Sequence, residues 1–282
     1  MSPSRAGKRL AARARWHDHV DAEPPHIRGK DDVIRGLIRR RRGSLPANRT
    51  IWTCWFQGED RAPPLVRRCL ASWRRGNPGW EVQCLDASTL AQFVDLPALA
   101  GKEISPAARS DVLRIHLLRR FGGVWVDATT YCNRPLDDWL AAYFASGFFA
   151  FARPAPDREV ASWFLAAALG NRTVDVWQAA VNDYWQSCSR RKDDYFWFHH
   201  IFNDLCASDP DFARDWGRVP RYSADAPHAL QRVGLSSPAH LGDPRIDWHT
   251  PVFKLSHHLD ERDYRPGTLV WRLLEGETAM GL

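Results

Sequence analysis

The sequence predicts an α/β fold with a largely parallel central sheet flanked by helices. Short segments rich in β-branched and aromatic residues recur along the chain, as at 50–56 and 80–86. Segments with the start and stop signals of helices lie between them, as at 63–76. Strands that alternate with helices in this way are typical of parallel sheets. The length of 282 residues, 44% of them hydrophobic, allows a sizeable core.

The first half of the fold alternates regularly between strand and helix. The segment TIWTCWF (50–56) is β-branched and aromatic, so it predicts the first strand. A helix then starts at Pro63 and stops at the Gly-Asn-Pro-Gly sequence that ends with Gly79. WEVQCLD (80–86) alternates as a second strand, and STLAQFV (88–94) predicts a short helix.

The clearest helix follows. Ser105 suits its N-cap, Pro106 suits its first position, and Gly122 suits its end. The next segment, VWVDATT (124–130), predicts a third strand. Later strands are predicted at 147–153, 251–256 and 268–274, and later helices at about 158–170, 173–188 and 194–207.

Basic residues are concentrated at the N-terminus of a chain whose formal net charge is +6. We expect residues 1–45, which contain the run RRRRG (39–43), to form a basic arm that is partly helical or disordered. Residues 46–282 then form the folded domain. The arm is either simply solvated or makes a peripheral contact with a membrane surface. Its basic residues do not interleave with aromatic residues, which argues against a nucleic-acid partner.

Cysteine usage and hydropathy predict a compartment. The 6 cysteines form no CxxC pair, and a chain of this length needs no disulfides, so we expect reduced thiols. No apolar run approaches the length of a membrane span, and the N-terminus lacks the apolar core of a signal peptide. The expected location is therefore the cytoplasm, with peripheral contact at the inner face of the membrane as the closest approach to lipid.

Two opposite charges lie within the apolar arc of the helix that starts at Ser105. At about 100° per residue, Asp111 and Arg114 fall among Ile115 and Leu118. Burying such charges costs several kcal/mol per ion unless they are paired or bound. They form either an ion pair that only braces the core or part of a polar cleft.

Asp127 is a lone acid at the end of a strand. The helix runs through Gly122 and Gly123 directly into that strand, and glycine permits close backbone approach. In α/β sheets, ligands gather at the carboxyl ends of strands. We therefore expect Asp111, Arg114 and Asp127 to converge at this end. The three together favour a functional cleft over a bracing pair.

The stretch ISPAARSDVLRIHLLRRFGGVWVDATTYCNRPLDDW (104–139) resembles the central signature of the capsular polysaccharide synthesis protein family. TIWTCWFQGED (50–60) resembles the family's first strand, and DDYFWFHHIF (193–202) and TPVFKLSHH (250–258) resemble its later motifs. The family is similar to the DXD-containing sugar transferases of glycosyltransferase family 32 and to the glucosylating bacterial toxins. The resemblance covers residues 46–270 and implies a GT-A type fold that binds a nucleotide-sugar.

The resemblance also implies roles for individual residues. By position, Trp52 matches the residue that stacks on the nucleotide base, and Asp111 and Arg114 match residues that hold the donor sugar. Asp127 matches the first Asp of the DXD motif, which binds a divalent cation, Mn²⁺ or Mg²⁺, together with the donor diphosphate. Thr129 stands in the second-Asp position, where a hydroxyl is a weaker ligand than a carboxylate.

The C-terminal half supplies further candidates. Lys254 can neutralise the charge that develops on a departing diphosphate. His257 and His258 either complete the metal shell with Asp127 and Thr129 or form a surface pair after an edge strand. We take Lys254 as a candidate catalytic residue together with Asp127.

Asp194 is the third candidate catalytic residue. It either contacts a sugar hydroxyl of the acceptor or only stabilises the start of an aromatic core helix. Near the first strand, Trp55, Gln57 and Glu59 are expected to border the base pocket. Asp137 and Asp138 are expected only to start a helix.

These residues predict a glycosyltransferase of the hexosyltransferase type. It would move a sugar from a nucleotide-sugar donor to a hydroxyl of a surface polysaccharide or glycan, by positioning and charge stabilisation. The resemblance to family 32 implies retention of the anomeric configuration. The alternative is a degenerate protein of the same fold that binds a nucleotide-sugar or glycan without turnover, and Thr129 is its main support.

Overall fold

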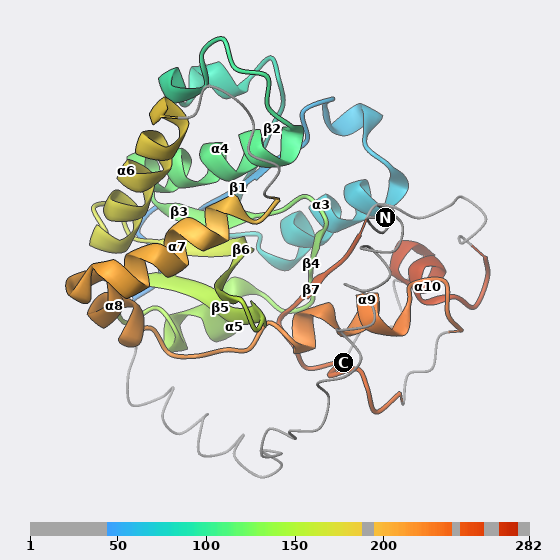
Figure 1. The fold of residues 1–282 in the computed structure, drawn as a ribbon. Helices are drawn as coiled ribbons and strands as arrows, with labels where there is room; N and C mark the ends of the chain where they lie inside the picture. The colour runs from blue at the N-terminus through green and yellow to red at the C-terminus, as the bar shows by residue number, and fades with distance from the viewer. Residues whose placement is uncertain (1–43, 188–194, 239–242, 257–264, 276–282) are drawn as a thin grey trace, which may run out of the picture. The chain divides into compact units, whose positions relative to one another are not determined.

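A computed structural model describes residues 44–187, 195–238, 243–256 and 265–275 of the chain (Figure 1). Of the predicted arm, only residues 44 and 45 fall within this part. At the centre is a five-stranded sheet with the strand order β2-β1-β3-β6-β5. Its strands are β1 (Thr50–Cys54), β2 (Glu81–Leu85), β3 (Gly123–Val126), β5 (Phe148–Ala155) and β6 (Arg158–Ala167).

The sheet is mostly parallel. Strand β1 runs parallel to β2 and to β3, whereas β6 runs antiparallel to both β3 and β5. Within this sheet, therefore, β5 points the same way as the first three strands and only β6 is reversed. Strands β1 and β3 are buried along their whole length, as expected for central strands covered on both faces. The predicted α/β class is confirmed.

Helices flank the sheet. The longer ones are α3 (Pro64–Gly76), α4 (Pro106–Phe121), α6 (Arg172–Ser187), α7 (Trp197–Ser208) and α8 (Pro210–Gly217). Helix α4 packs against β1, β3 and β6, and α6 packs against α4 and α7 (Figure 1). Within the described residues, no helix combines the length and the hydropathy needed to cross a membrane.

Shorter helical segments connect these elements. They are η1 (Glu59–Arg61), η2 (Leu90–Gln92), η3 (Pro97–Leu99), α5 (Leu136–Trp139), η4 (Leu140–Ala142), η5 (Ala226–His228), α9 (Ala229–Val233) and α10 (Leu269–Glu275). The helix predicted at 88–94 is only the single turn η2. Asp137 and Asp138 lie in the first turn of α5, as expected, and Asp137 accepts a hydrogen bond of 2.8 Å from Trp80 Nε1.

Helix α4 has the ends that the sequence predicts. The Ser105 hydroxyl accepts a hydrogen bond from the backbone N–H of Ala108 at 3.2 Å, and Pro106 occupies the first position. Gly122 ends the helix with a φ of 66°, a left-handed value that favours glycine. The helix therefore passes without a loop into β3, which fixes its charged residues relative to the end of that strand.

A second, two-stranded sheet pairs β4 (Thr130–Cys132) with β7 (Val252–Lys254) in antiparallel fashion. The strand predicted at 124–130 is thus broken, because the chain turns after β3 and the Thr130 N–H donates to the Asp127 carbonyl at 2.8 Å. In the pairing, Thr130 lies opposite Lys254. The turn that carries Asp127 and the end of β7 are therefore neighbours.

The prediction of a helix at 158–170 is wrong, because Arg158–Ala167 form strand β6. This strand lies between β3 and β5 and is buried from Val160 to Ala167. Both of its faces are apolar, so it lacks the alternation that marks a half-buried strand. A continuous apolar run of this kind has the same pattern as a buried helix.

The prediction of a strand at 268–274 is also wrong, because Leu269–Glu275 form helix α10. The Thr268 hydroxyl accepts a hydrogen bond from the Trp271 backbone N–H at 3.2 Å, which is the geometry of a helix N-cap. The segment is too short to show a helical period. Its β-branched and aromatic residues have the composition of a strand.

The cysteines of the described part of the chain form no disulfide bond. Cys54, Cys69, Cys84, Cys132 and Cys206 are free thiols, and Cys188 lies outside the described residues. Burial raises the pKa of Cys69 and of Cys132 to about 12. Burial also raises the pKa of Cys54, which lines the cleft described below. These thiols are protonated at neutral pH and are poor nucleophiles.

Candidate functional site

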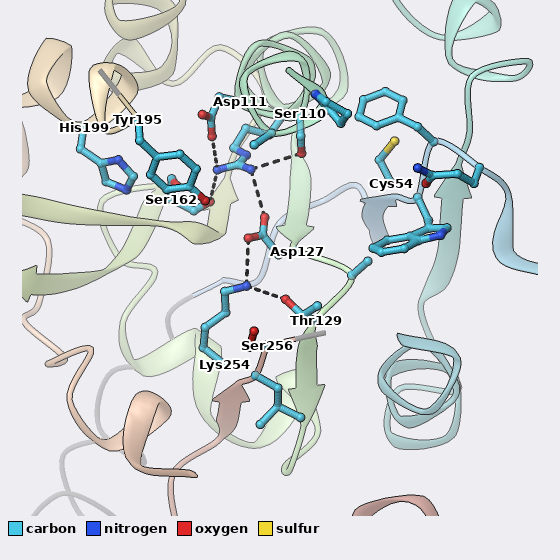
Figure 2. A pocket seen from close by; sticks show the side chains of 18 of the residues that line it. Cys54, Ser110, Asp111, Asp127, Thr129, Ser162, Tyr195, His199, Lys254 and Ser256 are labelled. Atoms are coloured by element: carbon cyan, nitrogen blue, oxygen red, sulfur yellow. Dashed lines mark hydrogen bonds and ion pairs between the residues drawn. The ribbon is translucent and has the colours of Figure 1, made fainter. Parts of the chain in front are cut away.

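A cleft of about 510 Å³ opens at the carboxyl ends of β1 and β3, beside the first turns of α4 (Figure 2). This size is common for small-molecule sites. Most of its lining comes from the end of β1, from α4, from the turn after β3 and from the end of β7. The lining residues are Cys54, Trp55, Phe56, Gln57, Pro106, Ala107, Ser110, Asp111, Arg114, Asp127, Ala128, Thr129, Ser162, Tyr195, His199, Gln231, Lys254, Leu255 and Ser256.

Four charged side chains form a continuous chain of ion pairs in this cleft (Figure 2). Arg114 Nη1 lies 2.6 Å from Asp111 Oδ1, and Arg114 Nη2 lies 3.0 Å from Asp127 Oδ1. Lys254 Nζ continues the chain at 3.2 Å from Asp127 Oδ2. The structure brings Asp111, Arg114 and Asp127 together as expected, and Lys254, predicted separately, joins them. We call these four residues the charge chain.

Arg114 is the most firmly held member of the charge chain. Its guanidinium also donates to the Ser110 hydroxyl and to the Ser162 carbonyl, each at 3.2 Å. The rings of Trp125 and Phe198 lie 5.3 and 5.7 Å from its central carbon. A guanidinium clamped in this way presents a fixed positive charge to the cleft, at little further entropic cost.

The two carboxylates of the charge chain differ in their protonation. Burial alone would raise the pKa of Asp127, but the neighbouring charges of Arg114 and Lys254 outweigh it and lower the pKa to about 2. Burial raises the pKa of Asp111 to about 7, against the attraction of Arg114, and the nearby Asp127 adds to the rise. At neutral pH Asp127 is ionised, whereas Asp111 is present in both its protonated and its ionised form.

His199 and Tyr195 also face the cleft, although neither was among the predicted site residues. Burial lowers the pKa of His199 to about 3, so its imidazole is neutral at neutral pH. Its Nδ1 is buried and has no hydrogen-bond partner among the described residues. Tyr195 is 71% exposed at the rim. The available signal was the aromatic cluster at 193–202 that contains both residues; Tyr195 precedes α7, whereas His199 lies in its first turn.

Trp52 does not lie in the cleft, which corrects the role predicted for it. The side chain is only 4% exposed, and its Nε1 donates to the Gly122 carbonyl at 2.9 Å. Its ring packs against Phe93 and Phe121, with centroid distances of 5.5 and 5.4 Å. The ring is thus buried in the core in this structure and is not open to a nucleotide base.

The other residues near the first strand divide between the cleft and the surface. Trp55 and Gln57 line the cleft, as predicted for a base pocket. Glu59 does not, and it instead forms an ion pair of 2.5 Å with Arg74 of α3. Trp55 is therefore the aromatic residue of this segment that the structure places at the site.

Two of the four predicted metal ligands fall within the described residues. Asp127 and Thr129 line the cleft, and both contact Lys254 Nζ, Thr129 through its hydroxyl at 2.5 Å. The described ranges contain no group of three or more His, Cys, Asp or Glu side chains that could hold a metal ion. A divalent cation at these two residues would therefore compete with the Lys254 ammonium group for their oxygen atoms. His257, His258 and the predicted catalytic Asp194 lie outside the described residues.

Two curated relatives are glycosyltransferases. The O-glycosyltransferase braB of Annulohypoxylon truncatum is 25% identical over 185 residues, which are 57% of this chain and 43% of that protein. The glycosyltransferase afumC of Aspergillus fumigatus is 26% identical over 239 residues, which are 73% of this chain and 57% of that protein. The chain thus spans about half the length of the curated relatives it matches.

A solved structure and a family model also match. The PaToxG glycosyltransferase superimposes with a TM-score of 0.42 at 14% identity, over 65% of this chain and 80% of that one. The model of the capsular polysaccharide synthesis protein family matches residues 36–273. Since this match covers most of the chain, including every residue of the charge chain, the protein belongs to the capsular polysaccharide synthesis protein family.

Proposed function

We propose that the protein is a glycosyltransferase that moves a hexosyl group from a nucleotide-sugar to a hydroxyl of a glycan acceptor. The observation that carries the proposal is the charge chain at the carboxyl end of the sheet. It puts two fixed cations, Arg114 and Lys254, into a cleft large enough for a small ligand. The names of the two curated relatives support the same reaction class.

In this proposal the cleft binds the donor and stabilises the departing diphosphate. The bond from the sugar carbon to the diphosphate oxygen breaks, and both of its electrons leave with the diphosphate. The acceptor hydroxyl oxygen forms the new bond to that carbon, and its proton passes to the departing diphosphate. Arg114 and Lys254 meet the negative charge that develops on the leaving oxygen. Because Arg114 is already clamped, little reorganisation is needed as this charge develops.

Asp111 and Asp127 orient the sugar and the two cations in this proposal. Carboxylates accept hydrogen bonds from sugar hydroxyls, and Asp111 lies at the end of the charge chain farthest from Lys254. Retention of configuration and a capsular-type acceptor are extensions of the family resemblance, as is the GT-A type of the fold. Asp194 remains the candidate for acceptor contact.

A second candidate function is nucleotide-sugar or glycan binding without turnover. One observation favours it: a threonine stands where a second carboxylate is expected, and its hydroxyl already contacts Lys254 at 2.5 Å. Release of free nucleotide from a bound nucleotide-sugar, with or without an acceptor, separates the two functions. A protein that only binds would release none.

The test is a thermal-shift screen of nucleotide-sugars on the wild type, Asp127→Asn and Asp175→Asn. Asp175 is the matched control, since it lies on α6, pairs with Arg119 at 3.2 Å and does not line the cleft. A ligand at about 100 times its dissociation constant adds roughly 2.7 kcal/mol. For a domain of this size we therefore expect a rise in Tm of about 5–10 °C.

The rise should occur with one nucleotide-sugar in the wild type and in the control, and it should be small or absent in Asp127→Asn. Each variant's Tm without ligand shows whether it is folded. If a folded wild type responds to no nucleotide-sugar and no free nucleotide, the donor-site proposal is wrong. Asp111 and Arg114 would then be a pair that braces the core.

A further inference from the structure

Lys254 lies between the two residues that would be expected to bind a divalent cation. Its Nζ is 3.2 Å from Asp127 Oδ2 and 2.5 Å from Thr129 Oγ1 (Figure 2). An ammonium group and a divalent cation both seek oxygen atoms, so the two would compete for this carboxylate and this hydroxyl. The structure has a protein cation at the position where the DXD motif would hold a metal.

The backbone keeps the lysine at this position. Lys254 pairs with Thr130 in the ladder of β4 and β7, and the next residue, Leu255, donates its N–H to the Thr129 carbonyl at 2.9 Å. The stem of Lys254 therefore starts beside the turn that carries Asp127 and Thr129. Its side chain is 17% exposed, and its backbone already lies next to the turn, so the ammonium group reaches Asp127 and Thr129 directly.

The oxygens of Asp127 are already engaged by other groups. Oδ1 accepts from Arg114 Nη2 at 3.0 Å and from Trp125 Nε1 at 3.1 Å, and Oδ2 pairs with Lys254. A divalent cation bound here would displace at least one of these donors. It would also lie close to the positive charges of Arg114 and Lys254, which repel it.

Lys254 retains capacity for a ligand. An ammonium group has three N–H donors, and Asp127 and Thr129 account for two of them among the described residues. The Lys254 side chain lines the cleft. The third donor is available for an oxygen of a bound diphosphate.

We infer that Lys254 replaces the divalent cation, so that this protein binds the diphosphate of its nucleotide ligand without a metal ion. The inference rests on the proposed function for the diphosphate, and it departs from the cation expected from the family resemblance. Lys254 neutralises the diphosphate as a point charge. Asp127 and Thr129 hold the ammonium group instead of ligating a metal.

The first experiment measures binding of the free nucleoside diphosphates by calorimetry, in EDTA and in excess manganese. The proteins are the wild type, Lys254→Ala, Lys254→Arg and, as the matched control, Lys102→Ala, a lysine that does not line this cleft. We expect the wild type and the control to bind equally well in both buffers. Lys254→Ala should bind about 10- to 100-fold more weakly in EDTA, the usual worth of a hydrogen bond to a charged group. Lys254→Arg should retain most of the affinity.

The second experiment measures Mn²⁺ itself, by the loss of the free-ion signal in electron paramagnetic resonance without nucleotide. Wild type should not bind Mn²⁺. The double variant Thr129→Asp with Lys254→Ala restores a second carboxylate and removes the ammonium group, so it should bind the ion. Circular dichroism establishes that each variant is folded.

The outcomes separate the inference from the proposed function. Binding of a nucleotide by the wild type only when manganese is present overturns the inference and leaves the glycosyltransferase proposal standing. Mn²⁺ binding by the wild type as tight as by the double variant also overturns the inference. Absence of any nucleotide binding in both buffers overturns the proposed function, and the inference with it.

Discussion

The charge chain shows how neighbouring side chains give two aspartates different chemistry. Asp127 lies between Arg114 and Lys254, so its negative charge is stabilised from both sides. Asp111 contacts only one of these cations, and its side chain is 12% exposed, so the cost of burial dominates. Carboxyl groups whose environments push their pKa values apart are suited to different tasks. Asp127 is the fixed charge of the site, and Asp111 is the carboxyl that can change its protonation near neutral pH.

This difference predicts how stability depends on pH. An unfolded Asp has a pKa of about 3.9, whereas burial raises the pKa of Asp111 to about 7 in the folded protein. Between these values the folded protein keeps a proton that the unfolded chain releases. The stability that Asp111 contributes is therefore present below pH 4 and is lost as the pH rises through 7. Asp111→Asn removes this loss, so its free energy of unfolding should fall less than that of the wild type over this window.

The measurement is urea unfolding at several pH values between about 4 and 8. The difference between the two proteins should grow with pH in favour of Asp111→Asn, by an amount on the order of 2–4 kcal/mol. Asp127 contributes in the opposite sense, since its stability is lost only as the pH falls from about 4 towards 2. It therefore leaves this window unchanged. Parallel pH profiles for Asp111→Asn and the wild type would show that Asp111 keeps an ordinary pKa.

Part of this site could be predicted from the sequence, whereas the contacts between distant segments could not. Asp111 and Arg114 stood out because two charges fell within an apolar arc, and a local pattern is enough to find such a pair. The contact of Lys254 with Thr129 joins residues 125 positions apart and arises from the pairing of β4 with β7. No local pattern reports that pairing. Trp52 was misplaced for the same reason, because the rings that cover it come from distant segments.

The junction of α4 with β3 is the element that holds the site together. Gly123 has a φ of 95°, and a Cβ there would lie 2.6 Å from the Thr50 carbonyl oxygen and 3.1 Å from Trp52 Nε1. Glycine thus allows β3 to lie close to β1 directly after the helix ends. This close approach sets the position of Arg114 on the helix relative to Asp127 at the end of the strand.

We expect Gly123→Ala to lower the free energy of unfolding by roughly 2–5 kcal/mol, because backbone strain and a steric clash add. Gly170→Ala is the matched control, since Gly170 also has a left-handed φ, of 75°, but its Cβ would meet nothing within 4 Å. It should cost only about 1–2 kcal/mol, the strain alone. Urea unfolding measures both. Equal losses in the two variants would mean that the junction tolerates a Cβ and does not constrain the site.

The elements also show which patterns a single sequence resolves. Helix α4 was predicted from a capping serine, a proline and a terminal glycine, all of them local signals. Strand β6 was not, because its identity depends on being inserted between β3 and β5. Burial on both faces removes the alternation that would distinguish it from a helix. Strand β6, the reversed strand of the sheet, is thus the one that was not predicted from the sequence.

At the scale of the whole molecule, the chain combines a folded domain with a strongly basic N-terminal segment. The central sheet, the helices that pack against it and the cleft are all built from residues after 43. The described part is tied together from its first residues, since the Asn48 side chain donates to the Phe121 carbonyl at 3.0 Å. The run of arginines at 39–42 precedes this part and contains four of the 39 Lys and Arg residues of the chain.

Deletion of residues 1–43 should therefore leave folding and nucleotide binding intact while removing attraction to anionic surfaces. We expect the Tm of the truncated chain to stay within about 2 °C of that of the full chain, a change below about 1 kcal/mol. The nucleotide that stabilises the full chain should stabilise the truncated chain equally. Lys and Arg near an anionic membrane contribute about 1 kcal/mol each, so the full chain should sediment with vesicles containing phosphatidylserine.

The truncated chain should remain in the supernatant, and rising salt should release the full chain, because the attraction is electrostatic.

A further deletion to residue 49 is the matched comparison for the fold. It removes the contact of Asn48 with Phe121, so it should lower the Tm. Vesicle binding that persists in the chain lacking residues 1–43 would place the membrane contact on the folded domain. Loss of nucleotide binding in that chain would make the basic segment part of the site.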